Sequence, residues 1–411
     1  MITFKVVFFN QNKLYPGNCI NLRAIWYHFL INTMKYAYRR ITFYLLISAS
    51  FLSMPVFGQY TLKGMVRDSL HKRPIANAMV FIDGTTKGTV TDNTGRFLLE
   101  DIPLPSLLVA SHISYQPGHI MIDGHTRDLT IFLNEQNLKL TEITVVNTNM
   151  RQANIKEFSR WFLGEDFWGR RAVIKNDSVL AFQRIKIPVE KTSDKTGQSE
   201  KSNLPDDMSL FYATSNQPLK VDMPLLGYNL YVILKDFMVR SYGNQCMSTC
   251  LGYYYYQPYN ATQQRNNKYN RNRRSAYYNS SQHFCRSLYN GSLAQNGYRI
   301  IKSTARGNNY EPHQLIDLNS FLLPPSDNQR MIVGLKGKKY RILYYHKLKG
   351  SPLDLTAHPE GILFKVSAIR FLQDTCFIRS DGSIPDNAVV FSGELSLKKA
   401  GASLPDDYVN K

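Results

Sequence analysis

The segment from Tyr60 to Val146 contains a succession of short apolar or alternating runs, and it constrains the fold more than any other part of the chain. The runs have the length of β-strands, and Gly, Pro, Asn and Asp residues separate them. In the separator Asp92-Asn-Thr-Gly95, the Asp can bond backbone N–H groups two or three residues on, and the Gly tolerates a positive φ. About seven such strands in roughly 90 residues are typical of a β-sandwich.

Residues spaced through this segment resemble the carboxypeptidase-regulatory-like domain, a transthyretin-like β-sandwich. The matching positions are Gly64, Val66, Pro74-Ile-Ala-Asn-Ala78, Val80, Gly84-Thr85, Gly88-Thr-Val-Thr-Asp92, Gly95 and Phe97. One departure is Ser114, which stands where a later Ser-x-x-Gly-Tyr motif of the family has Gly. The resemblance implies a seven-stranded sandwich at 59–146. It also implies an accessory role for this module, since the family domain is not a peptidase despite its name.

The first 58 residues contain the pattern of an export signal. Residues 34–40 are basic, residues 41–54 are apolar, and small residues stand at Val56 and Gly58, so a signal peptide at 34–58 would be cleaved before Gln59. The apolar stretch is shorter than the about 20 residues that a spanning helix needs. We therefore expect export to the periplasm or the outer-membrane periphery, or secretion, with no transmembrane segment in the mature chain. Residues 1–33 are interpreted as a mispredicted upstream extension.

The remainder, residues 150–411, is predicted to be an α+β domain rich in strands, which makes the whole chain mainly β with some α. Helical spacing covers Asn154 to Gly164 and Arg273 to Leu293. Strand-like runs occupy residues 178–182, 209–213, 227–234, 331–333, 340–345, 361–366 and 389–391, and a polar loop occupies 191–207.

Several blocks of this second region resemble exported Bacteroidetes-type proteins that carry the same N-terminal domain and whose function is not established. They include Arg160-Trp-Phe-Leu-Gly164, Gln217-Pro-Leu-Lys-Val221, residues 226–237, residues 272–277, residues 282–288 and Leu404-Pro-Asp-Asp-Tyr408. In TonB-dependent receptors, a run like 138–146 leads into a plug and a barrel. Too few residues follow here, and no ladder of alternating ten-residue strands is visible, so a transporter is not expected.

No catalytic, cofactor-binding or metal-binding residue is predicted. A zinc carboxypeptidase needs two His and a Glu around the metal, including a His-x-x-Glu pair, and none of the nine His residues has a Glu three residues later. The three short motifs of serine β-lactamases all occur, but in the wrong order. The chain is therefore expected not to be an enzyme.

Four of the five cysteines follow the signal segment. The spacing of Cys246 and Cys250 suits a local disulfide in an oxidising compartment, although four cysteines allow three pairings. A metal set with His283 and Cys285 is a weaker alternative, and Cys285 lies within an apolar helical pattern.

The stretch from Gly252 to Arg274 is rich in Tyr, Asn, Gln and Arg. Tyr253, Tyr255 and Tyr259 could stack on sugar rings if they were exposed. The favoured alternative is a β-strand whose alternate tyrosines are buried, followed by a polar loop and the basic start of a helix.

The formal net charge is +19, and about +13 remains without residues 1–58, which hold Lys and Arg but no acid. This balance favours peripheral contact with anionic lipid headgroups or acidic glycans, and export argues against nucleic acid. The main hypothesis is a non-catalytic exported envelope protein whose sandwich is an interaction module for an envelope protein or glycan. The alternatives are a carbohydrate-binding protein, and a hydrolase with an unrecognised site in 150–411 using acids such as Glu165 and Asp166.

Overall fold

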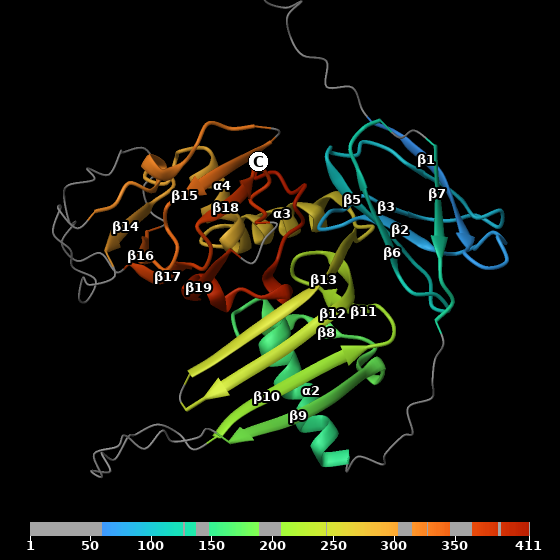
Figure 1. Ribbon diagram of the computed structural model, residues 1–411, viewed down its shortest axis with the longest axis horizontal. Coiled ribbons are helices and arrows are strands. Elements are labelled where there is room, and N and C mark those ends of the chain that lie inside the picture. Colours follow the sequence, from blue (N-terminus) through green and yellow to red (C-terminus); the bar gives the residue numbers. More distant parts are fainter. Residues whose placement is uncertain are drawn as a thin grey trace, which may run out of the picture. The chain divides into compact units, whose positions relative to one another are not determined.

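The computed structural model describes residues 60–125, 128–136, 148–188, 207–243, 245–302, 315–326, 328–345, 364–384 and 388–410 (Figure 1). All of them belong to one compact unit, Gln59–Lys411. The predictions for 1–58, for the extended run at 138–146 and for nearly all of the polar loop at 191–207 lie outside the described residues. None of the helices within these ranges has the length and apolar character needed to cross a membrane.

Seven strands in two sheets form the predicted N-terminal sandwich. One sheet has the order β4-β1-β7 and the other β3-β2-β5-β6, and only the β1–β7 pair is parallel among the pairs in these two sheets. Side chains alternate between the two faces of a strand, so Val66, Val80 and Leu108 meet in a buried aliphatic core. The strands are β1 (Leu62–Asp68), β2 (Met79–Ile82), β3 (Gly88–Val90), β4 (Arg96–Leu99), β5 (Ser106–Ser111), β6 (Gly118–Ile122) and β7 (Asp128–Leu133).

The turn before β4 forms with the hydrogen bonds that its sequence suggests. Asp92 Oδ1 accepts from the backbone N–H groups of Thr94, at 2.8 Å, and Arg96, at 2.9 Å. Gly95 has φ +74°, and a Cβ there would lie 2.7 Å from the carbonyl oxygen of Val66. Glycine is therefore required at position 95 both for its backbone conformation and for the close approach of β1.

A six-stranded sheet follows, built around the long strand β12. Strand β13 pairs with one edge of β12, while β11 and β10 pair with successive halves of its other edge. The strands are β8 (Val173–Ile174), β9 (Leu180–Pro188), β10 (Asp207–Ser215), β11 (Leu219–Met223), β12 (Tyr228–Tyr242) and β13 (Gln245–Pro258), with the short 3-10 helices η1 (Gly169–Arg171) and η2 (Asp177–Val179) before β9.

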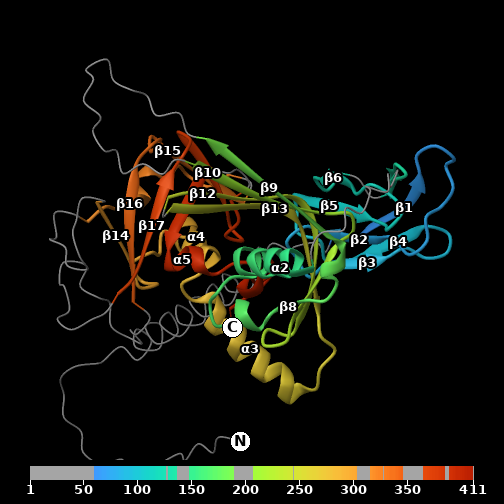
Figure 2. The same cartoon turned by 90° about the horizontal axis from the view of Figure 1, so that it is seen from below.

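Helix α2 (Thr148–Leu163) covers one face of this sheet (Figures 1 and 2). Phe158 and Phe162 project from it onto Phe237 of β12, with the Phe158 and Phe237 ring centroids 4.6 Å apart. Gly164 follows with φ +96°, a conformation that ends helices easily because glycine has no Cβ. The predicted helix is present and begins earlier than its apolar spacing indicates.

The single helix predicted over 273–293 is wrong. The structure has α3 (Gln263–Tyr277) and α4 (Ser281–Tyr289), separated at Asn279, which has φ +54°. The Ser280 hydroxyl accepts from the His283 N–H at 3.0 Å and so begins the second helix. Helical spacing continues from Ala276 to Leu288 across this break, which hides it from a periodicity argument.

The last part of the chain packs α4 against two sheets, one with the order β14-β16-β17-β19 and one of β15 and β18. Its elements are β14 (Tyr298–Lys302), η4 (Leu318–Phe321), β15 (Gln329–Val333), β16 (Lys339–Tyr344), β17 (Lys365–Phe371), β18 (Thr375–Arg379), β19 (Val389–Gly393), α5 (Glu394–Leu397) and η5 (Ala400–Ala402). Phe284, Ile342 and Phe371 are central to its core. The fold is mainly β with some α, as predicted.

Candidate functional site

The sandwich is joined to the rest of the chain by main-chain hydrogen bonds, and we call this region the seam. The Gly84 N–H donates to the Tyr254 carbonyl at 2.8 Å, and the Tyr256 N–H donates to the Thr85 carbonyl at 3.0 Å. The loop after β2 therefore pairs with β13 as a short strand would. On its other side, the Asp406 N–H donates to the Gly84 carbonyl at 2.7 Å.

The run of four tyrosines in β13 explains how the seam is filled. Tyr255 stacks on Phe81 of the sandwich with ring centroids 5.3 Å apart, and Tyr253 contacts His119 at 5.5 Å. Tyr254 and Tyr256 point the opposite way and pack on the core beneath the six-stranded sheet. Both faces of the strand are thus covered.

This burial corrects the proposed sugar-stacking surface. Tyr253 and Tyr255 are each only 9% exposed, so their faces are occupied by the protein itself. Tyr259 is partly buried, and its hydroxyl donates to the Asp222 carboxylate. The favoured alternative predicts a β-strand with alternate tyrosines buried, then a polar loop and the basic start of a helix. The strand and the helix are present, but tyrosines are buried on both faces of the strand.

A cavity of about 540 Å³ lies beside the seam, and Asp83, Asp406 and Lys398 are among its lining residues. Burial raises the pKa of Asp83 to about 6 and raises that of Asp406 well above its usual range. Burial also lowers the pKa of Lys398 to about 8. Carboxyls that retain protons at such pH values can serve as acid and base.

The contacts of these groups favour a structural role. Asp83 Oδ1 accepts from the Tyr254 N–H at 2.7 Å, and Lys398 Nζ donates to the Ala276 carbonyl at 2.7 Å, in the last turn of α3. The carboxylate of Asp406 lies against Gly84, where a Cβ would come within 2.2 Å of its Oδ2. Asp83 and Asp406 are therefore already used to hold the seam together, and Lys398 binds carbonyls at the end of α3.

The segment Leu404-Pro-Asp-Asp-Tyr408 closes the seam from the C-terminal side. The Thr86 N–H donates to Asp407 Oδ1 at 3.1 Å, and the Thr86 hydroxyl donates to the same carboxylate. The Arg286 guanidinium of α4 donates to the carbonyls of Tyr408, at 2.7 Å, and Asp406, at 2.9 Å. Only the resemblance of this block to other exported proteins marked it in the sequence, because its partners lie far away along the chain.

A second cavity of about 540 Å³, which we call the basic cleft, lies at the C-terminal end of α3. The Arg273 guanidinium stands 4.0 Å from the Tyr228 ring centroid and donates to the Leu226 carbonyl at 2.8 Å. Arg274 is exposed at the cleft. The cleft is lined by Thr86, Tyr228, Pro258, Asn270, Arg273, Arg274, Pro405, Asp407, Tyr408 and Val409.

Helix α3 itself is strongly basic. Its sequence contains five Lys or Arg residues and no acid, and they are Arg265, Lys268, Arg271, Arg273 and Arg274. Four of the five, all except Arg273, are exposed. No ion pair joins any of the five to an acidic residue within the described ranges. The sequence predicted a basic helix start here but not the cleft beside it.

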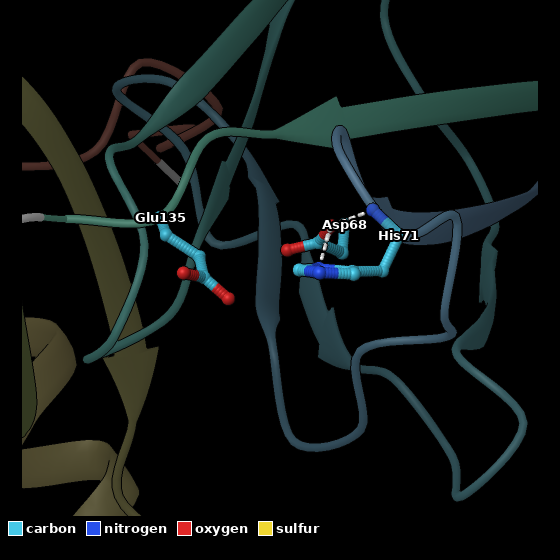
Figure 3. A group of neighbouring side chains, drawn as sticks. All are labelled: Asp68, His71 and Glu135. Atoms are coloured by element: carbon cyan, nitrogen blue, oxygen red, sulfur yellow. Dashed lines mark hydrogen bonds and ion pairs between the residues drawn. The ribbon is translucent and has the colours of Figure 1, made fainter.

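A third group lies at the end of the sandwich, where Asp68, His71 and Glu135 meet (Figure 3). Asp68 is 2% exposed, and its Oδ1 accepts from the Leu70 N–H at 2.8 Å. His71 Nδ1 lies 3.4 Å from the same oxygen. The backbone N–H of His71 also bonds this carboxylate and is the main reason that the pKa of Asp68 is below its usual value. The sequence did not reveal this group, because Glu135 is distant from the other two.

The cysteine predictions require correction. Cys246 and Cys250 are both free, and they lie four residues apart on β13. Four residues of an extended strand span about 13 Å, whereas the Cα atoms of a disulfide lie roughly 4.4–6.8 Å apart. The alternative metal set does not assemble within the described residues either, since His283 and Cys285 are buried on α4 and Cys246 is exposed on β13.

Glu165 and Asp166, suggested for a hydrolase, have local partners. Glu165 pairs with Arg160 at 2.9 Å on the surface. Asp166 accepts from the Gly169 N–H at 2.8 Å, and burial raises its pKa. The two carboxylates therefore support the end of α2 and the start of η1.

Comparison with known proteins assigns a class to the first module. Residues 62–145 match the family model of the CarboxypepD_reg-like domain. The TonB-dependent receptor SusC of Bacteroides thetaiotaomicron is 32% identical over 111 residues, which is 27% of this chain and 11% of the receptor. The chain thus spans about a tenth of the length of that curated relative.

Solved structures resemble the chain only weakly. A type II cohesin–X-dockerin complex from Acetivibrio cellulolyticus matches 18% of this chain and 56% of its own, with 25% identity and a TM-score of 0.16. A protein of unknown function from Bacteroides fragilis matches 49% of this chain and 98% of its own, with 10% identity and a TM-score of 0.16.

Proposed function

We propose that this protein is a non-catalytic exported protein of the cell envelope, whose sandwich and C-terminal region act as one body that binds an acidic glycan. The observation that carries the proposal is helix α3, with five Lys or Arg residues and no acid beside the basic cleft. The similarity of the first module to part of a TonB-dependent receptor supports an envelope location.

None of the five cations of α3 forms an ion pair within the described residues, so their charges are available for binding. Asp407 also lines the cleft, and its carboxylate accepts hydrogen bonds from Thr86. Clustered cations at a concave surface concentrate the field and attract carboxylate or phosphate groups. Arg273 is held in place by Tyr228 and by main-chain carbonyls, so it presents a fixed charge, whereas Arg274 is free to follow a ligand.

The shape of the basic cleft favours a glycan over a lipid surface. Its volume of about 540 Å³ falls within the roughly 300–1,000 Å³ typical of small-ligand sites. A flat layer of headgroups would contact α3 but could not enter the cleft. The sandwich serves as an accessory element, because the Thr86 side of the seam forms part of the cleft wall.

Replacing Lys268, Arg271 and Arg274 with Glu is expected to weaken binding to an acidic polysaccharide at least about tenfold, because several cation–anion contacts are lost together, one of them at the cleft. The measurement is affinity electrophoresis in gels containing polygalacturonate, with dextran as the neutral polymer. Arg273 stays unchanged because it packs on Tyr228.

The matched control replaces three exposed lysines elsewhere, Lys336, Lys338 and Lys339, with Glu. This variant has the same change in net charge and is expected to stay within about twofold of the unmodified protein. Equal losses in the two variants would show that net charge alone drives binding. Binding to anionic vesicles but not to polygalacturonate would assign the site to lipid instead.

A further inference from the structure

We propose that Asp68, His71 and Glu135 form a binding site for a divalent metal ion, and that Zn²⁺ is the ion that suits them. Two carboxylates and one imidazole are a ligand set that zinc accepts, with water completing the coordination. Calcium and magnesium prefer oxygen ligands alone, so the imidazole argues for a softer ion.

The spacing of the three side chains is close to what one ion requires. Their candidate ligand atoms all lie within 4.8 Å of one another. Two ligands at 2.0–2.2 Å from a tetrahedral ion lie about 3.4 Å apart, so the most distant pair must close by up to about 1.4 Å, and the exposed Glu135 side chain can make that movement. His71 Nδ1 and Asp68 Oδ1 are already 3.4 Å apart, about the separation of two ligands on a tetrahedral ion.

The second observation is an unsatisfied oxygen on Asp68. The Oδ1 atom accepts from the N–H groups of Leu70 and His71, and no hydrogen bond of normal length is formed at the buried Oδ2. The Tyr115 hydroxyl is close enough to this carboxyl to help lower its pKa. Figure 3 shows this second oxygen on the side that faces Glu135. Buried carboxylate oxygens are normally paired, and a bound cation would supply the missing partner.

Three separate segments of the sandwich hold the ligands in place. Asp68 ends β1 and its N–H donates to the Arg73 carbonyl at 2.8 Å, which closes the loop that carries His71. Glu135 follows β7 and forms a β-bridge with Tyr115. The hydroxyl of Ser69 also bonds the Asn134 side chain at 2.5 Å. The site is thus supported by the sandwich framework.

The charges around the site are compatible with a dication. Burial is the largest cause of the raised pKa of Tyr115. The charges of Asp68 and Glu135 raise this pKa further, and the charge of Arg73 lowers it. Arg67 and Lys72 are also nearby, and their side chains donate to the main-chain carbonyls of Lys72 and Ser69 and not to the two carboxylates. His71 is half exposed and Glu135 is exposed, so an ion and its water ligands can enter from solvent.

The test is a titration of the full chain, free of affinity tags and with its thiols alkylated, with Zn²⁺ in a calorimeter. We expect one saturable site that is weakened at least about tenfold in the His71→Gln and Glu135→Gln variants. The control is His125→Gln, an exposed histidine outside the group, which should bind as the unmodified protein does. Thermal unfolding without metal verifies that each variant is folded.

The same affinity and stoichiometry in the unmodified protein and in both ligand variants would overturn the proposal. Binding no tighter than about 1 mM would overturn it as well, since three protein ligands should exceed that affinity. A rise in melting temperature with Zn²⁺ that disappears in both variants would support it, because an ion that binds only the folded chain stabilises it.

Discussion

Replacing Asp83 with Asn is expected to raise the free energy of unfolding near pH 7 by up to about 3 kcal/mol. The pKa of this buried carboxyl rises from its ordinary value of 3.8 to about 6. Between these two pH values the unfolded chain has released its proton and the folded chain still holds it. The folded state binds more protons there, so stability falls as pH rises from about 4 to about 6 and the loss persists above that range.

The Asn side chain removes this penalty and keeps the useful contact. Its carbonyl oxygen can still accept from the Tyr254 N–H, which Asp83 binds at 2.7 Å. The gain should be largest above pH 6 and should vanish below about pH 4. Because the charge of Asp83 also raises the pKa of Asp406, part of the effect will come through that neighbour.

Urea unfolding at a series of pH values measures this effect directly. The control is Asp374→Asn on an exposed surface, for which a change within about 0.5 kcal/mol is expected. An unchanged slope of stability against pH in the Asp83→Asn variant would refute the explanation. Loss of stability at pH 7 would show that the negative charge itself is required at the seam.

Replacing Tyr255 with Ala is expected to cost about 3–5 kcal/mol, the range for removing a large buried aromatic side chain. The ring stacks on Phe81 at 5.3 Å and on Tyr231 at 6.0 Å. It also lies so close to Gly88 that a Cβ there would approach a ring carbon to 2.4 Å. The substitution leaves a hole between the sandwich and β13 that neither backbone can close.

The matched control is Tyr255→Phe, which keeps the ring and removes only the hydroxyl, and we expect it to cost less than about 1 kcal/mol. Chemical unfolding and limited proteolysis distinguish the two variants. The Ala variant should expose the sandwich to cleavage earlier than the rest of the chain, since contacts at the seam weaken first. Equal behaviour of the Ala and Phe variants would mean that the stacked ring contributes nothing to the seam.

The elements with strong local signals could be predicted from the sequence. The sandwich strands, the turn at Asp92 and the helix ended by Gly164 depend on alternation, turn chemistry and glycine conformation, all of which are local. The break at Asn279 could not be predicted, because the apolar spacing on each side of it is continuous and a positive φ at Asn is only one option for that residue.

The candidate sites could not be predicted from the sequence for a different reason. Asp83, Tyr254 and Asp406 come together because three segments that are distant in the sequence pair with one another. Residue spacing along the chain does not predict such a contact. Glu135 approaches Asp68 only because β7 pairs in parallel with β1. Alternation predicted that only alternate tyrosines of β13 are buried, whereas both faces are covered, because the partner that buries Tyr253 and Tyr255 was not identifiable from the sequence.

The seam has a consequence for how this chain can be divided. The sandwich has a recognisable family pattern of its own, yet its outward Phe81 face and its loop at Gly84 are completed by β13 and by the chain end near Asp406. A cut between the two regions would leave apolar surface and unpaired main-chain groups on both pieces. Exchange of this module between proteins would therefore require matching changes at β13 and at the C-terminus. The part of the chain that has to be exchanged as one piece is thus longer than residues 62–145, which match the family model.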